Sequence, residues 1–328
     1  MTSSDFIPLE SLQTAVLFLV FNRPDTTAQV FDAIRKAQPP RLYVAADGPR
    51  ADRACEAEKV DKVREIATAV DWPCEVRTLF RDDNLGCKYA VSDAITWFFD
   101  HEEQGIILED DCLPHPDFFT FCDVLLERYA DDERVSFISG DNFQRGLKRG
   151  DASYYFSHLP HLWGWATWRR VWQFYDVNMS YWPEWKISDS WRRKHYDKVE
   201  RKYWEKIFDI TYAQGIDTYD YQIIATAWRY GGLTATPNKN LVSNIGFGPD
   251  ATHTFNKSSR SSNNKTSAIG IIDHPREIKR DVDADRSDFD WQFGGKTMRF
   301  PYSIARFIKG FLKYSLRFFI NLTREIKK

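Results

Sequence analysis

The sequence predicts an α/β fold in which a mostly parallel sheet is flanked by helices. Two observations lead to this prediction: short apolar runs rich in β-branched residues, and segments of helical periodicity that alternate with them. The composition is that of a globular chain, with 43% hydrophobic and 28% charged residues among 328. This length is ample for one large domain, and no apolar stretch approaches the length of a membrane span.

The expected elements alternate from the first apolar run onward. They are a strand from Val16 and a helix from Pro24 or Asp25, a strand from Leu42 that ends in an Asp-Gly turn, a helix over about 54–70, a strand over 75–80, a helix within 84–95 and a strand over 105–108. Further expected elements are strands over 135–143 and 154–159, a helical region over 181–204, a helix from 216 to about 230, and a short strand with a glycine-rich loop over 231–254.

Three acidic residues, Glu109, Asp110 and Asp111, follow directly on the apolar run Gly105–Leu108. We therefore expect them at the carboxyl end of a strand, where open α/β sheets bind their ligands. Adjacent carboxylates repel one another, so a cleft that gathers them needs a cation. Hard oxygen ligands suit Mg²⁺ or Mn²⁺, which hold diphosphates through one or two protein carboxylates. The alternative is a solvated acidic turn.

The segment Ile107–Phe119 resembles the nucleotide-sugar motif of GT-A glycosyltransferases, in the Glu-Asp-Asp form of N-acetylglucosaminyltransferase I, where a proline and Asp-Phe-Phe also follow. It is also similar to a group of bacterial sugar transferases, some of them termed haemolysin-like. The resemblance covers most of residues 12–257, and its other specific parts are His161–Trp168 and Leu241–Thr254. It implies a GT-A-like, Rossmann-like domain that transfers a sugar from a nucleoside diphosphate to an acceptor hydroxyl.

The resemblance also implies roles for the acidic residues. Asp111 would ligate Mn²⁺ or Mg²⁺ directly, and Glu109 and Asp110 would hold the nucleotide and the sugar. Many GT-A enzymes use a late histidine as a further metal ligand, and His253 at the end of the glycine-rich loop is the candidate here. A lone histidine in a polar loop is otherwise a surface residue. The metal would act as a Lewis acid on the departing diphosphate.

Three residues are candidates for binding the donor nucleotide. Asp47, at the tip of the second strand, matches the acid that accepts a hydrogen bond from the uracil imide in this superfamily, so UDP is the favoured nucleotide. Arg23 follows the first strand, and its guanidinium suits the phosphate oxygens or the base. Lys88 would meet the diphosphate as a point charge. Each has an alternative: Asp47 would belong to an ordinary Asp-Gly turn, Arg23 would form a surface ion pair, and Lys88 would be a solvated helix residue.

Asp220 is the candidate catalytic base. The resemblance implies a carboxylate at a helix start after the metal motif in enzymes that invert the anomeric centre. Such a base accepts the proton of the acceptor hydroxyl and must lie within hydrogen-bond reach of it. The alternative is an acid stabilised by the dipole of the helix. Asp217 is the N-cap candidate, and the sequence leaves open an exchange of roles between these two residues.

Tryptophans crowd around Gly164 in the segment His161–Arg170. Trp163 and Trp165 are candidates for stacking on an acceptor sugar, and similar segments lie towards the acceptor side in the resembling bacterial group. The alternative is a core cluster that holds a helix on the sheet. Trp168 and Trp172 are four residues apart, which fits that alternative.

The composition divides the chain into three parts. We expect a GT-A-like domain at 1–257, a polar linker at 258–298 and a basic tail at 299–328. The tail has eight Lys or Arg and one Glu, whereas the whole chain has a net charge of −2, so the body is acidic. Apolar residues recur in the tail at helical spacing, which predicts an amphipathic helix on an anionic membrane surface. The alternative is a helix docked on the acidic body.

The remaining predictions concern compartment, partners and competing functions. The five cysteines are odd in number and show no Cys-x-x-Cys pair, which suits a reducing cytosol, and no secretory signal is evident. We expect a cytoplasmic protein, peripheral on the inner membrane, that serves bacterial surface polysaccharide synthesis with a glycan or lipid-linked acceptor. The acidic body disfavours nucleic acid as a partner. The competing functions are a non-catalytic glycan-binding protein and a sugar nucleotidyltransferase, although no glycine-rich basic loop follows the first strand.

Overall fold

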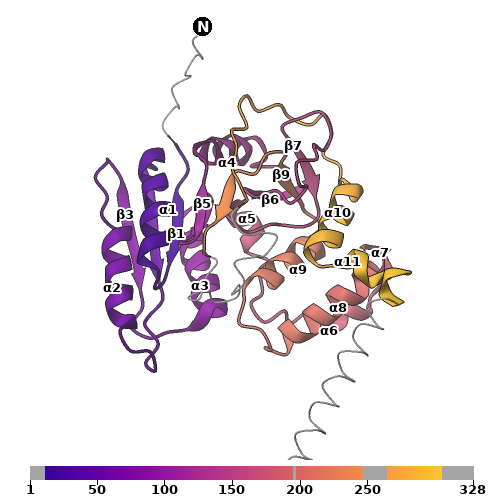
Figure 1. Ribbon diagram of the computed structural model, residues 1–328, viewed down its shortest axis with the longest axis horizontal. Helices are drawn as coiled ribbons and strands as arrows, with labels where there is room; N and C mark the ends of the chain where they lie inside the picture. Colours follow the sequence, from indigo (N-terminus) through magenta and orange to yellow (C-terminus); the bar gives the residue numbers. More distant parts are fainter. Residues whose placement is uncertain (1–11, 195–196, 247–263, 305–328) are drawn as a thin grey trace, which may run out of the picture.

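The computed structural model describes residues 12–194, 197–246 and 264–304 and confirms the expected α/β architecture. Eight of the described strands form one sheet in the order β3-β2-β1-β4-β8-β6-β9-β7 (Figure 1). They are β1 Val16–Val20, β2 Arg41–Ala46, β3 Glu75–Phe80, β4 Gln104–Glu109, β6 Val135–Ser139, β7 Tyr154–Ser157, β8 Trp165–Trp168 and β9 Leu233–Pro237. Within this described sheet, only β8 and β7 run antiparallel to their neighbours.

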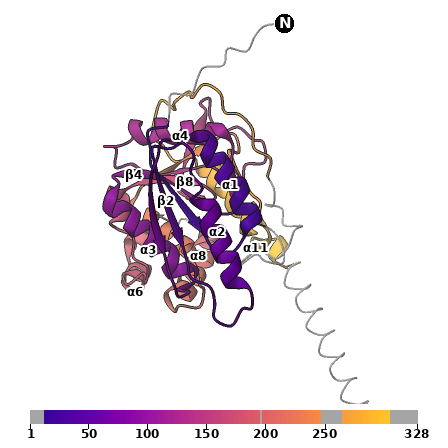
Figure 2. The ribbon, with the colours of Figure 1, turned by 90° about the vertical axis from the view of Figure 1, so that its left-hand side faces the viewer.

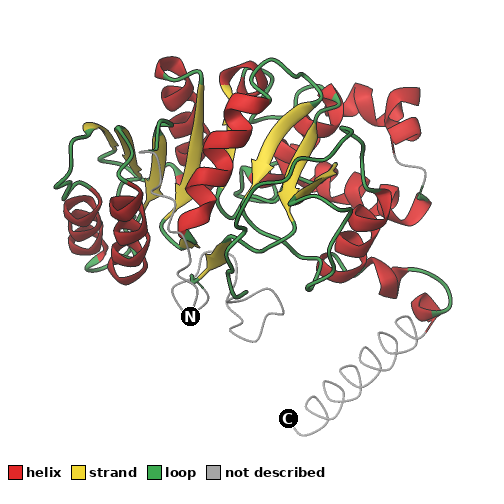
Figure 3. Cartoon of the chain, turned by 90° about the horizontal axis from the view of Figure 1, so that it is seen from above, coloured by secondary structure: helices red, strands yellow, loops and turns green. Residues whose placement is uncertain are grey.

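Helices cover both faces of the sheet (Figure 3). In the first two thirds of the chain they are α1 Pro24–Ala37, α2 Glu56–Ala67, α3 Gly86–His101, α4 Pro116–Arg128 and the short α5 Arg169–Trp172. Helices α1 and α2 pack side by side, whereas α3 packs on β1 and β2 from the opposite face (Figure 2). This division follows from the chain path, because α3 carries the chain back from β3 across β2 and β1 to β4.

The first helix illustrates why these segments fold as they do. Pro24 stands in the first turn of α1, where its fixed φ is already helical and its missing N–H costs no hydrogen bond. The buried side chains of α1 are Thr27, Val30, Phe31 and Ile34, at the spacing of a single helix face. Strand β1, by contrast, is buried along its whole length, because β2 and β4 flank it and helices cover both faces.

The order of the strands places a topological switch between β1 and β4. From β1 the chain steps outward to β2 and β3, and then returns to add β4 on the other side of β1. The connection after β1 therefore leads to one side along the sheet and the connection after β4 to the other, and such a switch opens a crevice at the carboxyl ends of these strands. Glu109 ends β4, and Asp110 and Asp111 follow it directly, so the acidic triplet stands at this crevice.

Two features of the sheet differ from the sequence prediction. The tryptophan segment forms β8, an antiparallel strand inserted between β4 and β6. A second, two-stranded sheet pairs β5, Cys112–Pro114, with β10, Val242–Asn244. Four buried residues in β8 show no alternation of polar and apolar side chains, and three in β5 are too few for a periodic signal. Both strands depend on partners distant in sequence.

A helical layer beyond the sheet accounts for many of the tryptophans. It contains α6 Trp182–Ile187, α7 Asp189–Lys194, α8 Lys198–Tyr212 and α9 Asp220–Tyr230. Trp182, Trp191 and Trp204 are fully buried, and the rings of Trp182 and Trp191 meet edge to face at 5.0 Å. The helical region expected over 181–204 is thus confirmed, and its aromatic residues form a core of their own.

Residues 264–298 pack on the domain, in contrast to the linker expected over 258–298. This part contains α10 Val282–Gln292 and α11 Gly295–Met298. Phe289 is fully buried, and Asp285 accepts a 2.6 Å hydrogen bond from the hydroxyl of Ser157 at the end of β7. The polar composition misled the prediction, since several of these carboxylates serve as buried acceptors rather than as solvated charges.

Several predictions fall outside the described residues. They concern residues 247–254 of the glycine-rich loop, which include His253, residues 258–263 of the linker and the tail from residue 305. Among the helices that the structure does describe, none combines the length and the apolar character needed to cross a bilayer.

Candidate active site

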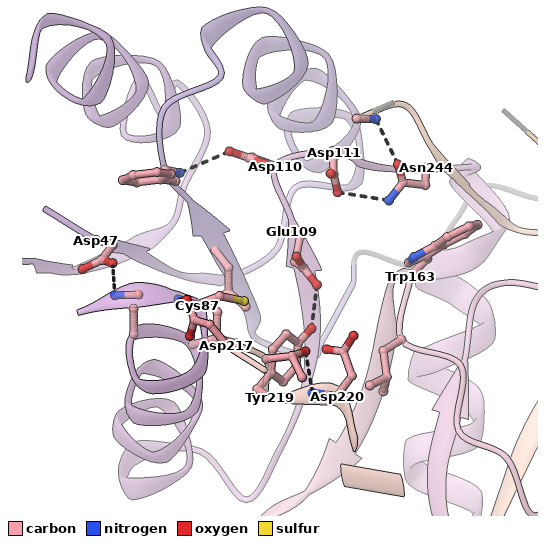
Figure 4. A pocket seen from close by; sticks show the side chains of 18 of the residues that line it. Asp47, Cys87, Glu109, Asp110, Asp111, Trp163, Asp217, Tyr219, Asp220 and Asn244 are labelled. Atoms are coloured by element: carbon pink, nitrogen blue, oxygen red, sulfur yellow. Dashed lines mark hydrogen bonds between the residues drawn. The ribbon is translucent and has the colours of Figure 1, made fainter. Parts of the chain in front are cut away.

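A cleft of about 450 Å³ lies at the carboxyl ends of β1, β2 and β4, at the topological switch of the sheet. We call it the acidic cleft. Figure 4 shows Asp47 on one side, the triplet Glu109, Asp110 and Asp111 in the middle and Trp163 on the other side. The acidic residues predicted from the sequence thus line one cavity, although they come from separate strand ends.

Arg23 bridges two carboxylates of the triplet. Its Nη1 donates to Oδ2 of Asp111 at 2.5 Å, and its Nη2 lies 3.6 Å from Oδ1 of Asp110. Burial alone would lower the pKa of Arg23, but the charges of Asp110 and Asp111 outweigh it and hold this pKa above the ordinary value. Asp110 also accepts a 3.1 Å hydrogen bond from the backbone N–H of Phe21. The end of β1 therefore holds the triplet in place.

Burial makes negative charge unfavourable in the middle of the cleft. It raises the pKa of Asp110 to about 6, and the pKa of Glu109 to about 8, where the charges of Asp111 and Asp220 add to the effect. The hydroxyl of Tyr219 donates to Oε1 of Glu109 at 2.5 Å and opposes the shift. A ligand that brings positive charge into this cleft would therefore be favoured.

The backbone of the chain surrounds Asp47. Its carboxylate accepts hydrogen bonds from the N–H groups of Gly48 at 2.9 Å, Leu85 at 3.0 Å and Gly86 at 3.1 Å. Burial raises the pKa of Asp47, and these hydrogen bonds oppose the shift. Asp47 lines the cleft and also joins the β2 turn to the start of α3. The N–H of Leu85 also lies 3.1 Å from the second carboxylate oxygen, so the backbone engages both oxygens of Asp47.

The structure separates the roles of Asp217 and Asp220. Asp217 accepts hydrogen bonds from the backbone N–H groups of Cys87 at 3.1 Å and Lys88 at 2.8 Å, and so caps α3. Gly86 has φ +78°, and a Cβ there would lie 2.9 Å from Oδ2 of Asp217, so the cap depends on glycine. Asp220 opens α9 and lines the cleft. Of the two acids, Asp220 is the better placed to meet a substrate.

Two predicted site residues are not brought to the cleft. Lys88 is buried on α3, with Nζ 3.5 Å from Oδ1 of Asn178 and 5.0 Å from the ring centre of Tyr89. Trp165 is fully buried in β8, and its ring packs on Phe137 at 5.9 Å. The core interpretation of Trp165 is therefore correct, and its assignment to sugar stacking is corrected. For Lys88, the side chain lies against Asn178 and Tyr89 and is not part of the cleft lining.

Trp163 does line the cleft. It precedes β8 in the connection from β7, and its ring meets Phe143 edge to face at 5.2 Å. A partly buried indole at the mouth of a polar cleft is suited to stacking on a sugar ring. Its role towards the acceptor remains a prediction.

A further acid, Asp141, was not singled out from the sequence. It follows β6, lines the cleft and is 1% exposed, and its Oδ1 has no hydrogen-bond partner among the described residues. Burial raises the pKa of Asp141 to about 7, although His161 opposes the shift. His161 in turn lies with Nε2 3.2 Å from Oδ2 of the buried Asp288. The signal in the sequence was an acid two residues after the end of a strand, and the prediction missed it because it extended the strand to residue 143.

The residues present fit a divalent cation that is held partly by protein carboxylates and partly by the diphosphate of a bound nucleotide. No three His, Cys, Asp or Glu side chains of the described chain surround a common point, so a cage made by protein alone is not evident in that part. A cation shared with a diphosphate needs one or two carboxylates, which Asp111 and its neighbours provide. A Cβ on Gly246 would lie 2.1 Å from Oδ2 of Asp111, so glycine keeps the approach to this carboxylate narrow but possible.

Comparison with known proteins adds little to this description. No protein-family model matches the chain, and no curated protein matches its sequence. Solved structures that match include HddC from Yersinia pseudotuberculosis, with 12% identity over 52% of this chain and 83% of that chain, at a TM-score of 0.33. A UDP-glucose pyrophosphorylase complexed with UDP-glucose has 7% identity over 69% of this chain and 90% of that chain, at a TM-score of 0.36. The glycosyltransferase GlyE of Streptococcus pneumoniae TIGR4 has 12% identity over 68% of this chain and 45% of that chain, at a TM-score of 0.31. These low values assign no function to this chain.

Proposed function

We propose that the chain is a GT-A-like glycosyltransferase that moves a sugar from a nucleoside diphosphate, with UDP favoured, to a hydroxyl of a glycan or lipid-linked acceptor. The observation that supports this most is the convergence of Arg23, Asp47 and the acidic triplet from three strand ends at the topological switch. Open α/β sheets bind nucleotides at such a switch. Asp220 and Trp163 line the same cleft, where an acceptor would enter.

The donor side is assigned as follows. Asp111 would hold Mn²⁺ or Mg²⁺, which when bound supplies Lewis-acid stabilisation of the diphosphate. His253 stays a candidate for a further ligand. Arg23 would bind the diphosphate oxygens, because it lines the cleft and its guanidinium matches the geometry of phosphate oxygens. Asp47 would accept the imide N–H of uracil, and Glu109 and Asp110 would orient the sugar and the nucleotide.

The transfer itself breaks one bond and forms one. The acceptor oxygen attacks the anomeric carbon, the bond from that carbon to the diphosphate oxygen breaks, and the diphosphate leaves with the electron pair. Asp220 takes the proton of the acceptor hydroxyl. If Asp220 lies opposite the leaving group, the configuration of the anomeric carbon is inverted. Asp141 is a further carboxylate of the cleft that can accept a proton, since its pKa is raised to about 7 and the triplet is assigned to the donor.

The biological setting is proposed from the sequence. A basic amphipathic tail would hold the enzyme on the cytoplasmic face of an anionic membrane, where lipid-linked acceptors of surface polysaccharide are elongated. The second candidate is a triphosphate-binding nucleotidyltransferase, against which the connection between β1 and α1 counts, because Phe21-Asn22-Arg23 contains no glycine.

The test is release of the nucleotide from a panel of sugar donors, with Mn²⁺ or with chelator: a nucleoside diphosphate from UDP-, GDP- and TDP-linked sugars, and CMP from CMP-linked sugars. The variant Asp111→Asn removes the proposed metal ligand, and Asp61→Asn, at an exposed position on α2, is the matched control. We expect slow hydrolysis of one donor that needs Mn²⁺, is abolished by Asp111→Asn and persists in the control. Formation of pyrophosphate from a nucleoside triphosphate and a sugar phosphate would instead identify a nucleotidyltransferase. Glycan binding without turnover of any donor would favour the non-catalytic alternative.

A further inference from the structure

A second cavity, of about 820 Å³, adjoins the acidic cleft and has the opposite charge. We call it the basic cavity. Four cationic side chains line it: Arg145, Lys148, Lys239 and Lys265. The one carboxylate in its lining is Asp273. Within the described residues, Arg145, Lys239 and Lys265 have no ion-pair partner. Unpaired cations around a concave surface favour an anionic ligand.

The walls of the basic cavity are held by hydrogen bonds of two partly buried amide side chains, Asn238 and Asn240. Asn238 donates from Nδ2 to the backbone carbonyls of Arg149 at 2.8 Å and Ala152 at 3.0 Å. Asn240 donates to the carbonyl of Val242 at 2.9 Å and accepts the N–H of Asn142 at 2.9 Å. The cavity therefore exists before a ligand arrives, which lowers the entropy lost on binding.

An aromatic ring accompanies the cations. Trp291, near the end of α10, lines the basic cavity and is partly buried. The guanidinium of Arg145 lies 5.9 Å from its ring centre, within the range of a cation–π contact. An indole beside unpaired cations combines a stacking surface for a pyranose ring with charge for an acidic substituent. Neither a simple anion nor a neutral sugar would use both features.

Two segments of chain run from the basic cavity to the acidic cleft. Phe143 lines both cavities, and its ring packs on His161 at 4.8 Å and on Trp163 at 5.2 Å. At the end of α10, Trp291 lines the basic cavity while Gln292 and Phe293 line the acidic cleft. A chain molecule seated in the basic cavity would therefore reach the acidic cleft past Phe143.

We propose that the basic cavity is an acceptor subsite that binds an anionic saccharide chain, with acidic groups at Arg145, Lys239 and Lys265 and a sugar ring at Trp291. This inference rests on the proposed function, since it assigns the growing end of that chain to the acidic cleft. The anionic groups are uronate carboxylates or phosphates, which these cations recognise in the same way.

The test is calorimetric binding of three probes to the full chain: a galacturonate hexamer, a mannan oligosaccharide with phosphomonoester groups, and neutral maltohexaose. The double variant Lys239→Glu with Lys265→Glu reverses two charges of the cavity at exposed positions. Lys59→Glu with Lys206→Glu, exposed on α2 and α8, makes the same change in net charge elsewhere. UDP binding is measured in parallel on each protein.

We expect at least one anionic probe to bind to the natural chain. Its affinity for the cavity variant should be at least about tenfold lower, and its affinity for the control variant should change little. The preferred probe identifies carboxylate or phosphate as the natural group. Equal binding of maltohexaose, an equal loss in the control pair, or tighter binding of a single-stranded oligonucleotide would overturn the inference. UDP binding without any anionic-glycan binding would refute the subsite and leave the proposed transferase intact. Specific anionic-glycan binding without UDP binding would support the cavity and refute the transferase.

Discussion

The two halves of the sheet contribute to the acidic cleft in different ways. In the half formed by β3, β2, β1 and β4, each strand is parallel to the next and delivers its site residues directly at its carboxyl end. In the half formed by β8, β6, β9 and β7, two strands are antiparallel, and the site residues come from connections and from the starts or ends of helices. In our proposal the regular half holds the nucleotide, and the irregular half selects the acceptor.

The largest expected effect tests the proposed base in the irregular half. Asp220→Asn is expected to lower the rate of nucleoside diphosphate release by about a thousandfold, because the carboxylate that accepts the proton is lost. UDP binding, which belongs to the regular half, is expected to stay within about twofold. Asp141→Asn serves as the comparison, and a larger rate loss from Asp141→Asn than from Asp220→Asn would transfer the role of base to Asp141.

The next effect separates two tryptophans that stand two residues apart. Trp165→Ala is expected to lower the free energy of unfolding by about 3 kcal/mol, since a fully buried ring is removed from β8. Trp163 lines the cleft, so Trp163→Ala is expected to lower the free energy of unfolding by about 1 kcal/mol or less and to weaken glycan binding. Urea unfolding and calorimetry measure the two quantities. Equal destabilisation by both variants would remove Trp163 from the acceptor side.

A smaller effect concerns the ion pair that closes the regular half. Arg23→Met removes the cation between Asp110 and Asp111 and is expected to lower the free energy of unfolding by about 2 kcal/mol, because two poorly hydrated carboxylates remain. Combining Arg23→Met with Asp111→Asn should recover part of that loss. No recovery in chemical unfolding would show that Arg23 acts by packing rather than by charge.

The smallest expected effect is a dependence of stability on pH. Burial raises the pKa of Asp141 to about 7, so the folded state binds a proton more tightly than the unfolded state. Stability from this group is present at low pH and is lost as pH rises from about 4 through 7. The variant Asp141→Asn has no carboxyl group to titrate and does not lose this stability. Its free energy of unfolding relative to that of the natural chain should therefore rise by at least about 1 kcal/mol between pH 5 and pH 8. A flat difference would contradict the raised pKa.

The regular half was predictable from the sequence, and the irregular half was so only in part. β1, β2 and β4 are apolar runs that helices cover on both faces, and the acidic triplet that begins with Glu109 marks the carboxyl end of β4. β8 is short, wholly buried and paired to strands distant in sequence, so no local pattern marks it. The position of the Lys88 side chain could not be predicted either, because it depends on how α3 packs in the folded chain.

Polar composition was the other source of error. Residues 264–298 carry many charges, which predicted a solvated linker, yet Asp285 and Asp288 are buried and hydrogen bonded. A sequence shows how many carboxylates a segment holds but not which of them have donors in the folded chain. Asp217 illustrates this too, because its role as a cap depends on backbone N–H groups about 130 residues earlier.

The central claim is that the end of the regular half binds a nucleotide together with a divalent cation. Calorimetric titration of UDP into the chain, with Mn²⁺ and with chelator, tests it most directly, with Asp111→Asn and the control Asp61→Asn as variants. The account predicts binding that requires Mn²⁺, is lost in Asp111→Asn and is retained in Asp61→Asn. Binding of equal strength in chelator, or unchanged binding by Asp111→Asn, would contradict it.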